Sequence, residues 1–463
     1  DEIAQILAQM HESQLTVRER KGEWERLRRR IVAAWETDEI RGQRPTPVDE
    51  AKWGFATVEN SLWKALPACL REFDECLRDV LGEGLTLDAT PIRIGSWMGG
   101  DRDGNPFVTH QVTAEVILLA RWMACDLYLR DIDTLRAELS LSRCGDALRA
   151  QVGDASREPY RDWLKQVRGR LQATQAAALA ALGRADAALQ SEAGDAIAYA
   201  TGDELLADMQ LCHDDLQAAG LALLCEGGLS DNLRRIATFG FGLMRLDIRQ
   251  ESTRHVDALA AITKYLGLGD YGAWDEQQRQ QFLLQELASP RPLLPLSALS
   301  TDVVSGFSDE VREVLATFQL LATQPAEALG AYVISMAHQP SDVLAVMVLQ
   351  RKADSRHPLR VVPLFETYDD LARAPSCLRS LLALPIYREC IGNHQEIMIG
   401  YSDSAKDAGF LAAAWAQYQA QEELTAIAAE AGVNLVFFHG RGGSVSRGGA
   451  PTDQALRSQP PGS

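Results

Sequence analysis

The stretch EIMIGYSDSAKDAGFLAAAWAQ, Glu396–Gln417, contains in one place the two patterns that set the fold class. Its first six residues form an apolar run of strand length, and apolar side chains recur at helical spacing from residue 407 onward. Ser402 and Asp403 stand at the junction between the two patterns. A strand followed by a helix, repeated along a chain, indicates parallel strands joined by crossover helices.

The same pattern, an apolar run followed by a helical segment, recurs on both sides of this stretch. Apolar runs of strand length occupy 91–97, 241–248, 331–337, 359–365 and 434–440, and helical patterns such as 367–384 separate most of them. Polar groups follow each run, which is typical of a parallel barrel, whose sites are built from several strand ends; an open doubly wound sheet gathers them at one switch point. The sequence therefore predicts a mostly α protein with an α/β barrel. We expect about six parallel strands of an incomplete TIM-like (β/α)8 barrel, plus large helical insertions.

Helical patterns fill the rest of the chain and suggest four regions. Residues 1–90 are expected to be an N-terminal helical region with a break near Thr16, and 91–112 the first barrel strand with its GGDRDGNP loop. Residues 113–235 read as a helical insertion that serves as scaffold and subunit contact. Residues 236–463 hold the remaining strands, helices and a glycine-rich loop.

Composition narrows the class of partner. The chain of 463 residues has a net charge of -18 and a pI of about 5.0, which argues against nucleic acid or an anionic membrane as its main partner. No apolar run approaches the roughly 20 residues of a membrane span, and the acidic, helical N-terminus is unlike a targeting peptide, so we expect a cytoplasmic protein. The eight cysteines form no C-x-x-C pair, which favours small, buried free thiols over disulfides or zinc ligands.

Two acidic residues follow apolar strands and are candidate metal ligands. Glu366 lies in PLFETYDDL and Asp403 in GYSDSAKDAG. Because the strand ends converge in a barrel, both carboxylates would point into the same open end of that barrel. Paired carboxylates with open positions suit Mg²⁺ or Mn²⁺. Either acid could instead cap the helix that follows it. Lys406, three residues after Asp403, could reach a phosphate or an enolate, or simply lie in that helix.

Basic residues gather near the same strand ends and indicate an anionic substrate. The arginines concerned are Arg102, Arg245, Arg249, Arg441 and Arg447. The last two belong to the loop HGRGGSVSRGG, which matches neither a Walker loop nor G-x-G-x-x-G and reads as an anion clamp. A small anion carrying phosphate and carboxylate is the expected substrate. His439 could be a proton shuttle, a phosphate donor or a structural hydrogen-bonding residue.

Taken together, these motifs resemble phosphoenolpyruvate carboxylase of the bacterial and plant type. The matching segments, in chain order, are TDEIRGQRPTPVDEA, GSWMGGDRDGNPFVT, RLDIRQESTRH, AYVISMA, VPLFET, GYSDSAKDAG, FHGRGGSVSRGGAP and SQPPGS. The resemblance implies an Mg²⁺-dependent carboxy-lyase that forms oxaloacetate and phosphate from phosphoenolpyruvate and bicarbonate, an anaplerotic carbon-fixing step that feeds the tricarboxylic acid cycle. It also implies a cytoplasmic homotetramer built on an eight-stranded barrel and controlled by small allosteric effectors.

The resemblance also implies roles for individual residues. By motif position, Glu366 and Asp403 match metal ligands, for Mg²⁺ or Mn²⁺. Two substrate-binding residues are expected to contact the phosphate, Arg249 and Arg441. Three more are expected to form an apolar pocket beside the substrate methylene: Trp97, Leu364 and Met398. Arg447 matches the arginine of a mobile glycine loop that also reaches an inhibitory effector. The catalytic candidates are the polar residues that follow strands: Arg249, Lys406, His439 and Arg441.

This chain departs from the family pattern in two ways. It is expected to be a fragment, lacking the family's TAHPTE-type segment with its histidine and everything after QPPGS, and to be inactive alone. Ser446 stands where the family usually has glycine. Two other functions stay open: another Mg²⁺-dependent barrel lyase or aldolase acting on a keto acid, and a non-catalytic helical scaffold.

Overall fold

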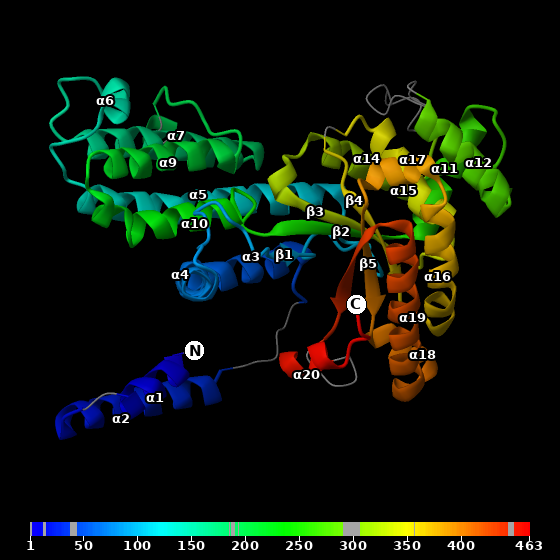
Figure 1. The fold of residues 1–463 in the computed structure, drawn as a ribbon, viewed down its shortest axis with the longest axis horizontal. Coiled ribbons are helices and arrows are strands. Elements are labelled where there is room, and N and C mark those ends of the chain that lie inside the picture. The colour runs from blue at the N-terminus through cyan, green and yellow to red at the C-terminus, as the bar shows by residue number, and fades with distance from the viewer. Residues whose placement is uncertain are drawn as a thin grey trace. The chain divides into compact units, whose positions relative to one another are not determined.

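The computed structural model of the protein describes residues 2–12, 15–37, 44–184, 186, 190–192, 194–289, 306–355, 357–442 and 449–463 (Figure 1). The chain forms two compact units, Asp1–Thr46 and Pro47–Ser463. The first contains the helices α1 (Glu2–Glu12) and α2 (Val17–Trp35). Thr16 begins α2 with a capping box in which it exchanges hydrogen bonds with Glu19, which confirms the break predicted near Thr16.

Helices make up the first part of the second unit. Two of them, α3 (Pro47–Thr57) and α4 (Trp63–Leu81), are joined by the π-helical stretch Val58–Leu62. The predicted helical insertion contains α5 (His110–Glu138), α6 (Asp146–Val152), α7 (Pro159–Ala181), α9 (Gly202–Ala218) and α10 (Gly228–Phe239). These helices share one apolar core with the rest of the unit, and Trp63 stacks on Phe239 within it at a centroid separation of 5.2 Å.

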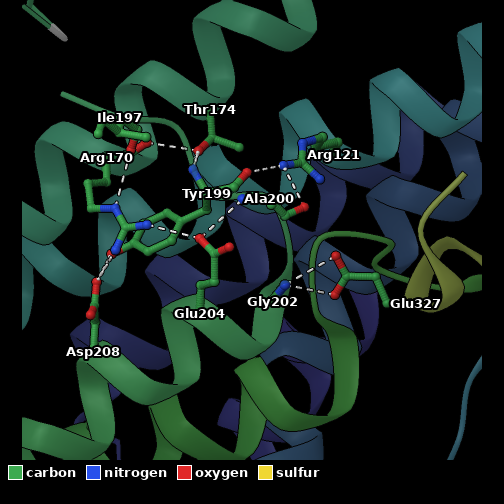
Figure 2. Close-up of polar contacts among 10 residues, drawn as sticks. All are labelled: Arg121, Arg170, Thr174, Ile197, Tyr199, Ala200, Gly202, Glu204, Asp208 and Glu327. Carbon is green, nitrogen blue, oxygen red and sulfur yellow. Dashed lines mark hydrogen bonds and ion pairs between the residues drawn. The ribbon is translucent and has the colours of Figure 1, made fainter. Parts of the chain in front are cut away.

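An ionic network fixes the segment before α9 to helix α7 (Figure 2). The guanidinium of Arg170 lies 3.8 Å from the ring centroid of Tyr199 and donates to Asp208 at 2.8 Å and Glu204 at 2.9 Å. The Tyr199 hydroxyl donates to the same Asp208 carboxylate at 2.7 Å. Cation–π and charge-assisted contacts therefore reinforce one another at this point.

Glu327 connects the insertion to the sheet. Its half-buried carboxylate accepts from the backbone N–H of Gly202 at 3.0 and 3.1 Å, at the start of α9 (Figure 2). It also accepts from the backbone N–H of Phe241. Burial raises the pKa of Glu327 despite these donors. Since Glu327 lies two residues before the first residue of the third strand, it ties the start of α9 to the sheet.

Six parallel strands form one sheet, in the order of the chain. They are β1 (Gly95–Ser96), β2 (Arg245–Glu251), β3 (Leu329–Ser335), β4 (Arg360–Phe365), β5 (His394–Gly400) and β6 (Asn434–Gly440). The connections carry α11 (Ser252–Tyr265), α12 (Glu276–Ala288), α14 (Asp309–Thr323), α15 (Pro340–Lys352), α16 (Tyr368–Leu382), α17 (Pro385–Ile391), α18 (Ser402–Ala408) and α19 (Phe410–Ala431), and α20 (Thr452–Arg457) follows β6. All neighbouring strands pair in parallel, and the sheet curls as half of a barrel, which confirms the prediction of six parallel strands separated by helices.

The two faces of the sheet differ because side chains alternate along each strand. One face forms a small apolar cluster on the concave side: Ala331, Val333, Val362, Leu364 and Met398, with Phe438 against them. The opposite face packs into the main core with the helices, and α16 and α19 run beside the strands in Figure 1. Alternation thus decides which residues can reach a site at the strand ends.

Strand boundaries differ from the predicted runs where the backbone adopts a left-handed conformation. Leu243 has φ 55°, so β2 begins at Arg245 and not at 241. Met336 has φ 54° and ends β3. The first strand is shorter than expected, because only Gly95 and Ser96 pair with β2.

The composition also leads us to expect free, buried cysteines and no membrane-spanning helix. All eight cysteines are free, as predicted, but Cys69, Cys76 and Cys390 are exposed, so the expectation of burial is wrong for these three. Over the described ranges, no helix combines the length and apolar character needed to cross a membrane.

Candidate functional site

A cavity of about 290 Å³ lies where the carboxyl ends of the strands converge. All six strands, or the residues directly after them, contribute to its lining. Seven of the residues singled out from the sequence line it together: Trp97, Arg249, Leu364, Glu366, Met398, Asp403 and Arg441. The apolar members come from the concave cluster of the sheet, and the charged members surround them at the strand ends.

A larger cavity of about 1380 Å³ lies among α4, α9 and α10, far along the chain from these residues. Its central acid, Asp74, is already engaged by Arg78, Arg234 and the backbone N–H of Leu85. None of the residues singled out from the sequence lines it. The smaller cavity is therefore the better candidate, because chemistry depends on the groups present and not on volume.

Glu366 is the buried acid of the site. It follows β4 directly, and burial, together with the nearby carboxylates of Asp103 and Asp403, raises its pKa to about 7. Arg249 and the backbone N–H of Met336 oppose this rise. The left-handed backbone at Met336 is thus at the site, where such strain commonly accompanies function.

Asp403 lies in the first turn of α18, partly exposed at the cavity lining. Lys406 is exposed on the same helix, and its Nζ lies 2.9 Å from Asp403 Oδ1, so it reaches the acid but does not line the cavity. Across the described ranges, no group of three or more His, Cys, Asp or Glu side chains gathers closely enough to hold a metal ion. Glu366 and Asp403 can offer only a pair of carboxylates, and their role as ligands stays a prediction.

Arg249 is fixed by the aspartates of the GGDRDGNP loop. Its Nε donates to Asp101 Oδ1 at 2.8 Å, and its Nη2 lies 3.5 Å from Asp103 Oδ2. Backbone hydrogen bonds extend the ladder of β2 into this loop, with the backbone N–H of Arg249 donating to Gly100 O at 3.0 Å. A Cβ at Gly100 would lie 2.1 Å from the carbonyl oxygen of Asp247, so only glycine permits this approach.

Arg441 follows β6 and is held by Tyr401. Its Nη2 donates to the Tyr401 hydroxyl at 3.1 Å, and its guanidinium lies 4.8 Å from the centroid of the same ring. His439 Nδ1 lies 2.9 Å from that hydroxyl, but His439 does not line the cavity, because alternation along β6 puts Phe438 on the concave face. Burial, and then Arg441, lower the pKa of His439.

Two of the five arginines do not join this site, so the prediction that all five converge is wrong. Arg102 is buried and donates to Gly100 O at 2.8 Å and to Thr113 Oγ1 at 2.6 Å. Arg245 begins β2 and therefore lies at the amino end of that strand, away from the cavity. Arg447, and Ser446 beside it, lie outside the described residues.

Sequence reasoning missed three polar residues of the site. Tyr401 was counted as the last residue of an apolar strand, although the strand register places it beside Arg441. Asp101 and Asp103 belong to the predicted GGDRDGNP loop, but the sequence assigns neither of them a role of its own. The signal that could have found them is charge: two acids within three residues, on a loop expected beside Arg249, are natural ion-pair partners.

Comparison with known proteins gives the family. The phosphoenolpyruvate carboxylase family model matches residues 1–463. Curated relatives named phosphoenolpyruvate carboxylase include those of Acinetobacter baumannii, 53% identical over 466 residues, Marinobacter nauticus, 54% over 464, and Ectopseudomonas mendocina, 56% over 463. Each alignment covers 100% of this chain and 51% of the relative, so the chain spans about half the length of the curated relatives it matches. With a family match over its full length and a cavity lined by the motif residues, the chain belongs to the phosphoenolpyruvate carboxylase family.

Proposed function

We propose that this chain carries part of the active site of an enzyme that converts phosphoenolpyruvate and bicarbonate to oxaloacetate and phosphate. One observation supports this most strongly: Arg249 and Arg441 share a cavity with the acids Glu366 and Asp403 and with an apolar wall. Family membership favours this reaction over another barrel lyase or aldolase, and over a helical scaffold.

The two arginines suit a phosphoryl group in transfer. In the proposed reaction a bicarbonate oxygen bonds to phosphorus as the bond from phosphorus to the enol oxygen breaks, giving carboxyphosphate and an enolate. Carboxyphosphate then loses phosphate to give carbon dioxide, and the enolate carbon bonds to that carbon. Arg249 is fixed by Asp101, and Arg441 by Tyr401, so both donors are preorganised for the developing negative charge.

The apolar residues suit the part of the substrate that becomes a carbon nucleophile. Leu364 and Met398 are buried on the concave face, and Trp97 is exposed at the cavity lining. Such a wall would accommodate the methylene of phosphoenolpyruvate. It would also exclude water from the carbon dioxide and the enolate before they combine.

Glu366 and Asp403 would hold Mg²⁺ or Mn²⁺. The fit rests on donor chemistry, since carboxylate oxygens suit hard cations. Burial, and then the charges of Asp103 and Asp403, raise the pKa of Glu366, and a bound cation would offset both. Bound there, the ion would supply positive charge that stabilises the enolate and phosphoryl oxygens. Water or substrate oxygens would have to complete its ligands.

We extend the proposal to a closed, eight-stranded TIM-like barrel, because six parallel strands in chain order already curl with helices outside them. A cytoplasmic homotetramer regulated by small effectors is proposed from family membership alone.

The test is a coupled assay of oxaloacetate formation, with phosphoenolpyruvate, bicarbonate and Mg²⁺ varied separately, on the 463-residue chain and on a full-length protein carrying it. The full-length protein should require all three. Oxaloacetate formation without bicarbonate would indicate another lyase or aldolase, and no turnover at all would favour the scaffold.

A further inference from the structure

Strand register brings three polar side chains to one corner of the cavity. In the ladder between β5 and β6, Ile399 is opposite His439 and Gly400 is opposite Gly440. The next residues, Tyr401 and Arg441, therefore lie side by side. His439, near the end of β6, and Arg441, just past that end, both lie within hydrogen-bond distance of the Tyr401 hydroxyl, although only Arg441 lines the cavity.

The contacts in this corner have a single consistent direction. Arginine has only donors, so the Tyr401 oxygen must accept from Arg441 across the 3.1 Å contact. The one hydroxyl proton of Tyr401 is then available for His439 Nδ1, which lies 2.9 Å away. This direction requires His439 to be neutral, with its own proton on Nε2.

The surroundings favour that state of His439. Tyr401 is nine-tenths buried and packs in the main core, which limits the competition of bulk water for its hydroxyl. Burial and the neighbouring guanidinium both lower the pKa of His439. A ring carrying protons on both nitrogens would instead aim an N–H at the oxygen that accepts from Arg441.

We infer that Tyr401 is a positioning residue that fixes the Arg441 guanidinium at the cavity, with neutral His439 accepting the tyrosine proton. The ring of Tyr401 supplies a second restraint, since the guanidinium lies 4.8 Å from its centroid. Arg441 thus keeps its remaining N–H groups for an anion in the cavity. His439 acts through Tyr401 in this arrangement and is not the proton shuttle that the sequence suggested.

The hydrogen-bond direction is tested on the chain itself, without any assay of activity. Selective ¹³C and ¹⁵N labelling of histidine distinguishes the two neutral tautomers and the imidazolium of His439 by NMR. The wild-type ring should be the Nε2–H tautomer with Nδ1 accepting a hydrogen bond. Observation of the Nδ1–H tautomer, or of an imidazolium at pH 8, would overturn the inference, and this measurement needs no variant that has to fold.

Variants then test the chain of contacts. Tyr401→Phe keeps the ring and removes both hydrogen bonds, so the Nδ1–H tautomer should become populated. Tyr418→Phe is the matched control, because Tyr418 stacks on Trp415 away from the cavity and its hydroxyl has no hydrogen-bond partner within the described ranges. The His439 spectrum should not change in that control. A spectrum unaffected by Tyr401→Phe would also overturn the inference.

The consequence for catalysis rests on the proposed function and is measured separately. In a full-length protein, Tyr401→Phe should lower kcat/KM for phosphoenolpyruvate about tenfold, the loss typical of one hydrogen bond to a charged group, and Tyr401→Leu should lower it further. Wild-type kcat/KM in Tyr401→Phe would refute positioning. Absence of carboxylation in the wild-type protein would refute the proposed function and leave the tautomer result standing.

Discussion

Replacing Glu366 by Gln should make the stability of this protein less dependent on pH. Burial and two neighbouring carboxylates raise the pKa of Glu366 from 4.5 to about 7. Because the folded state binds this proton more tightly than the unfolded state, the stabilisation is complete below pH 4.5 and is lost as pH rises to 7. Each pKa unit is worth about 1.4 kcal/mol, so the loss amounts to about 3 kcal/mol. Glu366→Gln cannot ionise and should lack this loss.

The assay is urea unfolding at several pH values between 5 and 8, with and without Mg²⁺. The stability of Glu366→Gln relative to wild type should rise across this window by up to about 3 kcal/mol. Mg²⁺ should stabilise the wild type at pH 8 and leave the variant unchanged, because a ligand that binds only the folded state raises its stability. Glu422→Gln, exposed on α19, is the matched control and should follow the wild type.

If the difference in the free energy of unfolding between wild type and Glu366→Gln stays constant from pH 5 to pH 8, the raised pKa of Glu366 is refuted. Equal stabilisation of both proteins by Mg²⁺ would refute the role of Glu366 as a metal ligand.

Three further predictions follow from contacts already described. Arg441→Ala in a full-length protein should reduce oxaloacetate formation by about 10² to 10³-fold in the coupled assay, since it removes a donor to developing charge; near-wild-type turnover would show that the loop is structural. Gly100→Ala should lower the free energy of unfolding in urea by about 3 kcal/mol, because its Cβ would lie 2.1 Å from a carbonyl oxygen of β2. In the control Gly95→Ala, the nearest atoms to the new Cβ are 3.6 Å away, so the loss of stability should be far smaller. Glu327→Ala should lower the free energy of unfolding by about 2 kcal/mol, since it leaves two buried backbone donors unpaired. Glu327→Gln keeps one acceptor oxygen, so its loss of stability should be smaller. Equal losses of stability in the two variants would mean that the hydrogen bonds contribute little.

The strands were predictable because their signal is local. An apolar run followed by a helical pattern identified β4 and β6 almost to the residue, and the run at 434–440 matches β6. The boundaries of β2 and β3 were not predictable from the same signal. Left-handed backbone at Leu243 and Met336 sets them, and neither residue type favours that conformation by itself.

The site was predictable where function follows directly from a strand end. Glu366, Arg249 and Arg441 were found in this way, and the structure brings them to one cavity. What could not be predicted is which polar groups pair with one another. The partners of Arg249 and Arg441, namely Asp101 and Tyr401, depend on the register between strands, and no local pattern encodes register between residues 148 or 40 positions apart.

The order of the strands has a consequence for how the chain folds. From β2 to β6, every strand pairs with its predecessor after one crossover, so each can dock as it leaves the ribosome. The pair β1–β2 differs, because residues 97–244 separate its partners. The longest of the other connections is 252–328, and closing a loop about twice as long costs roughly 0.6 kcal/mol more. The insertion must fold first to bring β1 to β2. Arg249 then meets Asp101 only once β1 has reached β2, so a chain whose insertion has not folded would present an incomplete anion site.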